Sequence, residues 1–183
     1  MLYTNTCVER DEKERVLADL ESGREALLDV LTGVTEDVAV VSPVPGKWSV
    51  LECVEHLAVS EEYLFGQIEA SHASEVATLN EKREALIVAR GLDRTRTIES
   101  PEVGRPAARF STLAEAVQSF LAARERTVRF VESCGEDLRA KSTWHPIVGI
   151  VNCHETLLMI AVHPHRHARQ IAEIKSALID RVR

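Results

Sequence analysis

The feature that most constrains the fold of this chain is a helix-start signature that precedes four long periodic stretches. Each copy has Ser, Thr or Asn, followed three residues later by Glu. In such a capping box the first side chain accepts a hydrogen bond from a free helix amide, and the Glu side chain reaches back to the first residue's amide. The four copies are Thr6 with Glu9, Ser49 with Glu52, Thr112 with Glu115, and Asn152 with Glu155. They predict the starts of four helices.

The stretches that follow these signatures set the expected helices. Apolar residues recur at spacings of three and four over about 7–32, 50–72, 113–133 and 153–180. Gly33 ends the first stretch, and Gly135 lies where the third is expected to have its C-terminal cap. Ala, Leu, Val, Glu and Arg are abundant, and this composition also favours helices. We therefore predict an all-α chain, a four-helix bundle that forms a single domain over residues 1–183.

The connections differ in length and character. Segment 34–47 contains two prolines and a glycine, so we expect it to be non-helical and to place Trp48 at the start of the second helix. Segment 73–111 is the least regular, and we expect a short helix near 75–89 followed by a surface loop. A connection this long between helices two and three can cross the end of a bundle. It therefore permits those two helices to run parallel.

The second helix has two different faces. Glu55, Glu62 and Glu69 recur every seven residues, a pattern that predicts a solvated outer face. His56 lies at the margin of the opposite face, a position that suits a ligand at the rim of a cleft. That inner face is expected to hold Cys53, Leu57, Ser60 and Leu64.

Composition and charge exclude several classes of protein. The net charge of -7 argues against a general nucleic-acid binder, which needs a basic face. No apolar run approaches the roughly 20 residues of a membrane span, and the start of the chain lacks the pattern of a signal peptide. The four cysteines form no C-x-x-C pair, so we expect reduced thiols rather than a disulfide framework. These features predict a cytoplasmic protein.

The last predicted helix carries the strongest chemical signal. His163 and His167 are four positions apart, so their rings stack on one helix face and can converge on one ion. They also lie within an apolar stripe, where two imidazoles without partners would be costly to bury. Catalytic zinc-like sites usually take three protein ligands and leave one position open. His56 is the best candidate for the third ligand.

Other residues on this helix are less suited to bind the same ion. His154 and His165 lie off the stripe and are excluded as ligands. Pro164 removes an amide that would bond to Ile160 inside the helix. Two interpretations of it stay open: a bend that opens the bundle at the metal, or a simple irregularity.

Four other residues have a functional and a structural interpretation. His145 is a candidate acid/base or substrate contact, or it anchors a turn before a proline. Gln170 is a candidate cofactor-binding residue that orients a ligand from one turn away, or it is a solvated polar residue. Cys53 is a fourth ligand, a redox thiol or a packed small residue, with packing favoured. Glu52 is explained by its capping role.

Four motifs together resemble a known family. They are Trp48-Ser49 at a helix start, Glu55-His56-Leu57, Trp144-His145-Pro146-Ile147-Val148-Gly149, and His163-x-x-Arg166-His167-x-x-Gln170-Ile171. Their order, spacing and the chain length resemble the DinB-like superfamily of small bacterial metal-binding four-helix bundles.

The resemblance implies more than the residues alone. It implies a left-handed bundle with a long link between helices two and three. It implies zinc or nickel held by one His of the second helix and an H-x-x-x-H pair of the fourth, positions that match His56, His163 and His167. That family is similar to transferases that use bacillithiol, mycothiol or glutathione, and many members are described as metal-dependent hydrolases. Pro164 departs from the usual family pattern.

Two functions follow as hypotheses. The first is an enzyme in which three neutral imidazoles hold a divalent ion that activates water for hydrolysis or a thiol for transfer to a small molecule. No general base stands out, which favours the thiol version. The second is a non-catalytic, stress-related module whose metal joins two helices. The expected partner is a small-molecule substrate or a thiol. We expect no nucleic-acid partner and no membrane partner, and pairing into a homodimer is an open alternative.

Overall fold

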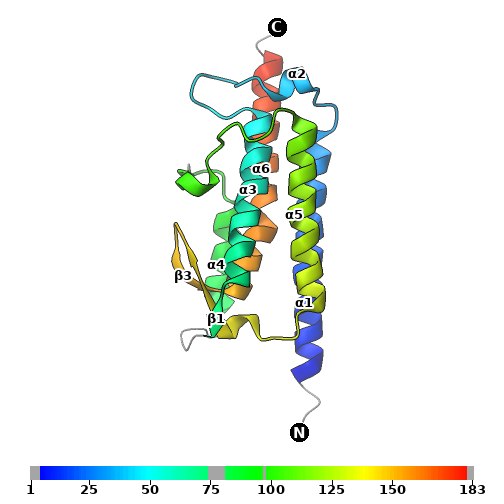
Figure 1. The fold of residues 1–183 in the computed structure, drawn as a ribbon. Helices are drawn as coiled ribbons and strands as arrows, with labels where there is room; N and C mark the ends of the chain where they lie inside the picture. The colour runs from blue at the N-terminus through cyan, green and yellow to red at the C-terminus, as the bar shows by residue number, and fades with distance from the viewer. Residues whose placement is uncertain (1–4, 74–80, 97, 181–183) are drawn as a thin grey trace.

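The backbone of residues 5–73, 81–96 and 98–180 is described by a computed structural model, with side chains from residue 10 onward. Four long helices form a bundle (Figure 1). They are α1 Asn5–Leu31, α3 Val50–Glu69, α5 Leu113–Ser133 and α6 Cys153–Asp180. The predicted four-helix bundle is confirmed, and the bounds of α5 and α6 are those expected from the sequence.

Three of the four predicted capping boxes are present. In the box that starts α3, Glu52 N–H donates to Ser49 Oγ (3.2 Å), and Ser49 N–H donates to Glu52 Oε2 (2.7 Å). The same reciprocal bonds join Thr112 with Glu115, and Asn152 with Glu155. The box predicted at Thr6 and Glu9 lies outside the described side chains. Local sequence therefore sets where these helices begin.

The predicted C-terminal glycines behave differently. Gly33, after α1, has a φ of +76°, the left-handed conformation that favours glycine at a helix end. The expectation for Gly135 is wrong, because α5 is capped by Cys134 in an extended conformation and Gly135 has no positive φ.

The long link sets the direction of the helices. In Figure 1, α1 and α6 run from the bottom of the view to the top, whereas α3 and α5 run from top to bottom. Helices α3 and α5 pack against each other and are parallel, the arrangement that the length of the link permits. None of the described helices combines the length and apolar character needed to cross a membrane.

The bundle interior consists of two clusters of buried apolar residues. The first includes Leu27, Val50, Leu57, Phe120 and Ile171. The second includes Leu20, Phe65, Val131, Leu157 and Ile160. Along three of the four helices, buried polar residues lie between the two sets: Glu61 on α3, Arg124 and Thr127 on α5, and His167 on α6. A polar layer thus crosses the middle of the bundle.

The connection after α1 was expected to be non-helical, but it contains a helix. A short helix, α2 (Glu36–Ala39), forms before the prolines that interrupt this segment. Its Glu36 carboxylate accepts hydrogen bonds from the amides of Leu113 (2.7 Å) and Ala114 (3.1 Å). These are free amides in the first turn of α5, so a distant segment adds to the capping of that helix.

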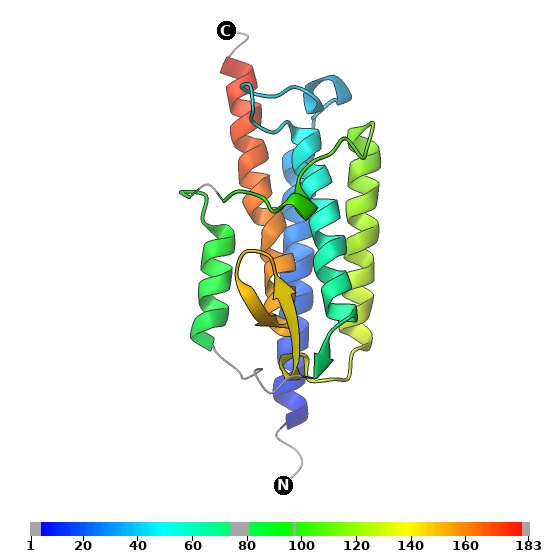
Figure 2. The same cartoon turned by 60° about the vertical axis from the view of Figure 1, so that its left-hand side comes forward.

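The link between α3 and α5 contains more structure than a surface loop. Helix α4 (Glu81–Leu92) lies beside α6 (Figures 1 and 2). It confirms a helix over most of the predicted range 75–89, and residues 75–80 of that range lie outside the described part of the chain. A single 3-10 turn, η1 (Glu102–Gly104), then packs against α3. The link therefore covers one side of the bundle.

The predicted solvated outer face of α3 is wrong at Glu55. Glu62 and Glu69 are exposed as expected, but Glu55 is only 1% exposed. Its Oε1 accepts hydrogen bonds from the amides of Ala107 (2.7 Å) and Arg109 (3.2 Å). A seven-residue spacing identifies one face of a helix, but it does not show that the link will cover part of that face.

A small antiparallel sheet was not anticipated. It contains β1 (His72–Ala73), β2 (Lys141–His145) and β3 (Gly149–Asn152), in that order. Helix α3 therefore ends at Glu69, before the predicted residue 72. The motif Trp144–Gly149 forms part of a hairpin in which His145 pairs with Gly149, whose φ is +76°. The sheet is a minor addition to a helical fold.

Candidate metal centre

The structure brings His56, His163 and His167 together. His56 comes from α3, and the other two come from successive turns of α6. The Nε2 atom of His163 lies 3.1 Å from Nε2 of His56 and 3.0 Å from Nε2 of His167. The three candidate ligand atoms all lie within 4.8 Å of one another. Among the described residues, this is the group of His, Cys, Asp or Glu side chains that could hold a metal ion.

These distances fit a shared ion, and the donor and acceptor roles of the rings favour an ion over direct hydrogen bonds. Two nitrogens bonded at about 2.0–2.1 Å to one ion, with angles near 90–110°, are about 2.8–3.4 Å apart. Nε2 of His163 carries either a proton or a lone pair. It therefore cannot donate a hydrogen bond to one neighbouring ring nitrogen and accept one from the other. A cation that accepts a lone pair from each ring satisfies all three. The donor set therefore fits a divalent metal, and three protein ligands leave one of the usual four positions of zinc open.

Burial keeps the three imidazoles neutral. Loss of solvent lowers the pKa of His56, and it lowers the pKa of His163 and His167 well below the usual value. The neighbouring rings and the Arg166 guanidinium lower the pKa of His163 and His167 further, since each disfavours an added positive charge. At neutral pH these rings thus have free lone pairs for a metal.

The link orients His56. The Nδ1–H of His56 donates to the carbonyl oxygen of Gly104 in η1 at 2.6 Å, and Ser60 Oγ lies 3.3 Å from the same nitrogen. Because a carbonyl only accepts, this contact places the proton on Nδ1 and leaves the Nε2 lone pair for the ion. Gly104 was not predicted as a site residue, although a glycine in a loop is a signal of close backbone approach.

The close approach leaves little space for a side chain at position 104. A Cβ built there would lie 2.9 Å from Ser60 Oγ and 3.3 Å from both Cε1 and Nδ1 of His56. His167 lacks a comparable partner, because its Nδ1 is buried without a hydrogen bond to any described residue. One ligand is therefore oriented by the link, whereas His167 is held by its helix and by packing.

Trp48 packs against the imidazoles. Its ring centroid is 4.9 Å from that of His56 and 6.2 Å from that of His167, with the latter pair nearly parallel at 20°. The expected position of Trp48 just before the second helix places it here. The indole covers two of the rings with apolar surface, which limits their contact with water.

Three arginines lie near the imidazoles. Arg166, Arg124 and Arg94 each lower the pKa of His163 or His167, and Arg124 and Arg94 are paired with Glu61 and Glu173. Arg166 itself is bound to the link, through Nη1 to the carbonyl of Asp93 and Nη2 to that of Arg96 at 2.7 Å. The site therefore favours an anionic ligand.

The other predicted site residues have structural partners. His145 Nδ1 accepts from the amides of Ile147 (3.2 Å) and Val148 (3.4 Å), so it anchors the hairpin turn. It also lies near enough to lower the pKa of His163. Gln170 Oε1 accepts from Arg94 Nη1 (3.2 Å) rather than from one of the three histidines. Their candidate roles stay predictions.

The remaining alternatives are placed away from the ring nitrogens. Cys53 is fully buried in the first apolar cluster, and burial raises the pKa of its thiol, so it is a packed residue rather than a thiolate. Glu52 is the capping residue of α3. His165 Nε2 lies 3.3 Å from Ser22 Oγ, and buried His154 lies 3.7 Å from the carboxylates of Glu12 and Glu84.

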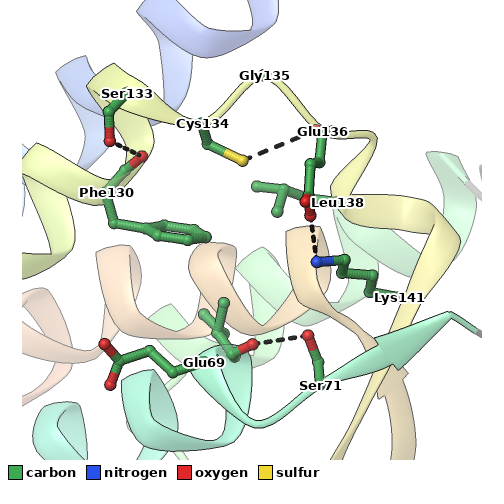
Figure 3. Close-up of a pocket in the computed structure, with 10 residues that line it drawn as sticks. Glu69, Ser71, Phe130, Ser133, Cys134, Gly135, Glu136, Leu138 and Lys141 are labelled. Carbon is green, nitrogen blue, oxygen red and sulfur yellow. Dashed lines mark hydrogen bonds and ion pairs between the residues drawn. The ribbon is translucent and has the colours of Figure 1, made fainter.

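A pocket elsewhere in the molecule does not involve these histidines. It lies where α3 and α5 end, beside the start of β2 (Figure 3). Its walls include the Phe130 ring and Leu138, together with Cys134 and the ion pair between Lys141 and Glu136. The three-histidine group is therefore separate from this pocket.

Comparisons with known proteins agree with this architecture. A family model described as the DinB superfamily matches residues 19–171. Among solved structures, YfiT from Bacillus subtilis has 16% identity and a TM-score of 0.57, with 91% of this chain and 87% of that chain covered. It is described as a probable metal-dependent hydrolase with an unusual four-helix bundle topology.

A second solved structure, the four-helix bundle protein TT2238, has 18% identity and a TM-score of 0.56, with 88% of this chain and 98% of that chain covered. At these identities the two structures show a shared fold. A search of curated proteins found no match. The family model covers most of the chain, including the three histidines, and we conclude that the chain belongs to the DinB superfamily.

Proposed function

We propose that this protein is a metal-dependent enzyme that acts on a small molecule, with a divalent ion held by His56, His163 and His167. The observation that carries the proposal is the convergence of three Nε2 atoms, with separations of 3.0 and 3.1 Å. Zinc and nickel suit a site of neutral imidazoles. When bound, such an ion supplies Lewis-acid chemistry and lowers the pKa of a coordinated water or thiol. The description of YfiT as a probable metal-dependent hydrolase supports the same reaction class.

Thiol transfer is the version that the surroundings of the site favour. Three imidazoles add no negative charge, and the charged groups that affect them are arginines. This environment suits an anionic thiolate from a low-molecular-weight thiol. The two buried carboxylates on α3 are engaged elsewhere, Glu55 with the link amides and Glu61 with Arg124. Hydrolysis would need a base, for which His145 is the remaining candidate.

A non-catalytic role is the alternative, and one observation favours it. The three rings join α3 to α6, so a bound ion would stabilise the bundle without any reaction. A cytoplasmic location, the absence of nucleic-acid and membrane partners, and pairing into a homodimer are parts of the proposal that rest on sequence alone.

The first experiment is elemental analysis of protein purified without added metal. We expect one equivalent of a divalent metal in the wild type and almost none in His56→Ala. His165→Ala is the matched control, because its ring lies on the same helix but outside the group. Equal metal content in all three proteins would contradict the site.

The second experiment separates the two functions. Metal-loaded protein is assayed with bacillithiol, mycothiol and glutathione and an electrophilic acceptor, and with ester and amide substrates. Turnover that is lost in folded His163→Ala supports the enzyme. Unfolding on chelation, with no turnover of any substrate, supports the structural role.

A further inference from the structure

Helix α6 is interrupted directly after the candidate ligand His163. Pro164 lies inside α6, is buried and has no N–H, so it cannot bond to the carbonyl of Ile160 one turn earlier. A buried carbonyl without a partner would cost free energy. Arg124 of α5 supplies the missing donor, because its Nη2 donates to Ile160 O at 3.1 Å. A side chain from another helix thus replaces the lost backbone hydrogen bond.

Arg124 is itself held rigidly. It is 1% exposed, and its Nε and Nη2 donate to the two carboxylate oxygens of Glu61 at 2.9 and 2.8 Å. Thr127 Oγ1 donates to the same carboxylate at 3.0 Å, and Arg124 Nη1 donates to the carbonyl of Leu20. The guanidinium therefore connects α5 with α1, α3 and α6.

The ion pair between Arg124 and Glu61 contacts both helices that supply the imidazoles, α3 through Glu61 and α6 through the Ile160 carbonyl. Glu61 follows His56 by five residues on α3, and Ile160 precedes His163 by three on α6. The Arg124 charge is close enough to lower the pKa of His163. Both groups belong to the polar layer between the two apolar clusters. A shift of this ion pair would therefore move α3 relative to α6 at the level of the three rings.

Close packing by α1 completes the arrangement. A Cβ built at Gly23 would lie 2.5 Å from the carbonyl oxygen of Ala161 and 3.5 Å from Cγ of Pro164. Only glycine allows α1 to approach the interrupted turn this closely. The backbone around Pro164 is consequently confined from two sides, by α1 and by Arg124.

The ion pair between Arg124 and Glu61 is better explained by a role other than stability. A buried ion pair often contributes no more to stability than apolar residues of similar size, because both charges lose their hydration. The planar guanidinium of Arg124, by contrast, fixes the direction of its hydrogen bonds as well as their length. We propose that Arg124, oriented by Glu61, is a positioning residue for the metal centre: it binds the carbonyl left free by Pro164 and so sets the direction of His163 toward His56. This inference rests on the proposed metal site.

The test measures Co²⁺ as a probe of the site, by its affinity in competition with a chelator and by its visible spectrum. The variant combines Arg124→Met with Glu61→Leu, so that no buried charge is left unpaired. We expect it to fold and to bind Co²⁺ roughly 10-fold to 100-fold more weakly, the usual effect of losing an outer support of a metal ligand, with an altered spectrum. The exposed pair on the same helix, Arg129→Met with Glu125→Leu, is the matched control and should change neither property.

Pro164→Ala tests whether Arg124 affects the metal site through the Ile160 carbonyl. This substitution restores an amide that can bond to Ile160, so the Arg124→Met and Glu61→Leu replacement should then weaken Co²⁺ binding much less. An equal loss in both backgrounds would overturn the route through the Ile160 carbonyl. If the double replacement fails to fold, Arg124→Lys takes its place, since Lys keeps the charge near Glu61 but lacks the fork that reaches Ile160.

The outcomes distinguish this inference from the proposed function. A wild-type protein that binds no Co²⁺ would overturn the metal site itself, and the positioning role with it. Normal binding by the wild type, with unchanged affinity and spectrum in the folded variant, would overturn only the positioning role of Arg124.

Discussion

The bundle interior and the link between α3 and α5 are held by different forces. The bundle buries two apolar clusters, whereas α4 of the link has no buried residue. The link is attached instead by polar contacts: Arg83 with Glu155, Glu84 with Arg139, and Arg166 and Arg169 with link carbonyls. Yet this link supplies the carbonyl that orients His56. A site with its ligands on the bundle thus depends on a segment that salt and pH can affect.

Replacing a core aromatic residue should have the largest effect on stability. Phe120 is fully buried in the first cluster, and Phe120→Ala should lower the free energy of unfolding by about 3–5 kcal/mol, because burial is lost and a cavity remains. The matched change in the link is Leu86→Ala on α4, where the side chain is 46% exposed. It should change stability by less than about 0.5 kcal/mol. Urea unfolding measures both, and similar losses would contradict the contrast between core and link.

Adding a methyl group to the link should act on the metal centre rather than on the fold. Gly104→Ala places a Cβ against Ser60 and the His56 ring, so the ring or η1 must move. We expect Co²⁺ affinity to fall roughly 10-fold to 100-fold, with a smaller change in thermal stability. Gly135→Ala is the control, because its Cβ would meet nothing within 4 Å and its φ is not positive. Unchanged affinity in Gly104→Ala would show that the link does not orient His56.

Acid should loosen the contacts of the link around His154, and this is the smallest expected effect. His154 is surrounded by Arg139, Glu12, Glu84 and Glu155, and burial lowers its pKa from the usual 6.5. The hydrogen bond from Arg139 lowers the pKa of Glu12 from 4.5. The unfolded chain therefore binds more protons than the folded chain, first at His154 below about pH 6.5 and then at Glu12 below about pH 4.5, so stability falls as pH falls.

Hydrogen exchange at pH 7 and pH 5, corrected for intrinsic rates, measures this effect. Amides of α4 should open more often at pH 5, and His154→Gln, which removes the imidazole that takes up the proton, should reduce this increase. An equal increase in His154→Gln and in the wild type would contradict the role of His154.

The predictable parts of the molecule were those set by local sequence. The starts of α3, α5 and α6 were predicted because each capping box involves residues only three positions apart. The pairing of His163 with His167 follows from one turn of helix, and the predicted His56 does lie beside them. Glu55 was predicted wrongly, since its burial depends on amides more than 50 residues away in the chain. Gly104 and Glu61 were missed for the same reason.

The sequence by itself determined the helices, their order and the histidines that approach one another, because capping, periodicity and one-turn spacing are short-range properties of the chain. Only the tertiary structure decided how the link covers α3, which tautomer His56 adopts, and which donor binds the carbonyl left free by Pro164. Those outcomes depend on contacts between Gly104 and His56, and between Arg124 and Ile160, that no local pattern encodes. The physical reason is that a buried polar group must find a partner wherever packing brings one within about 3 Å.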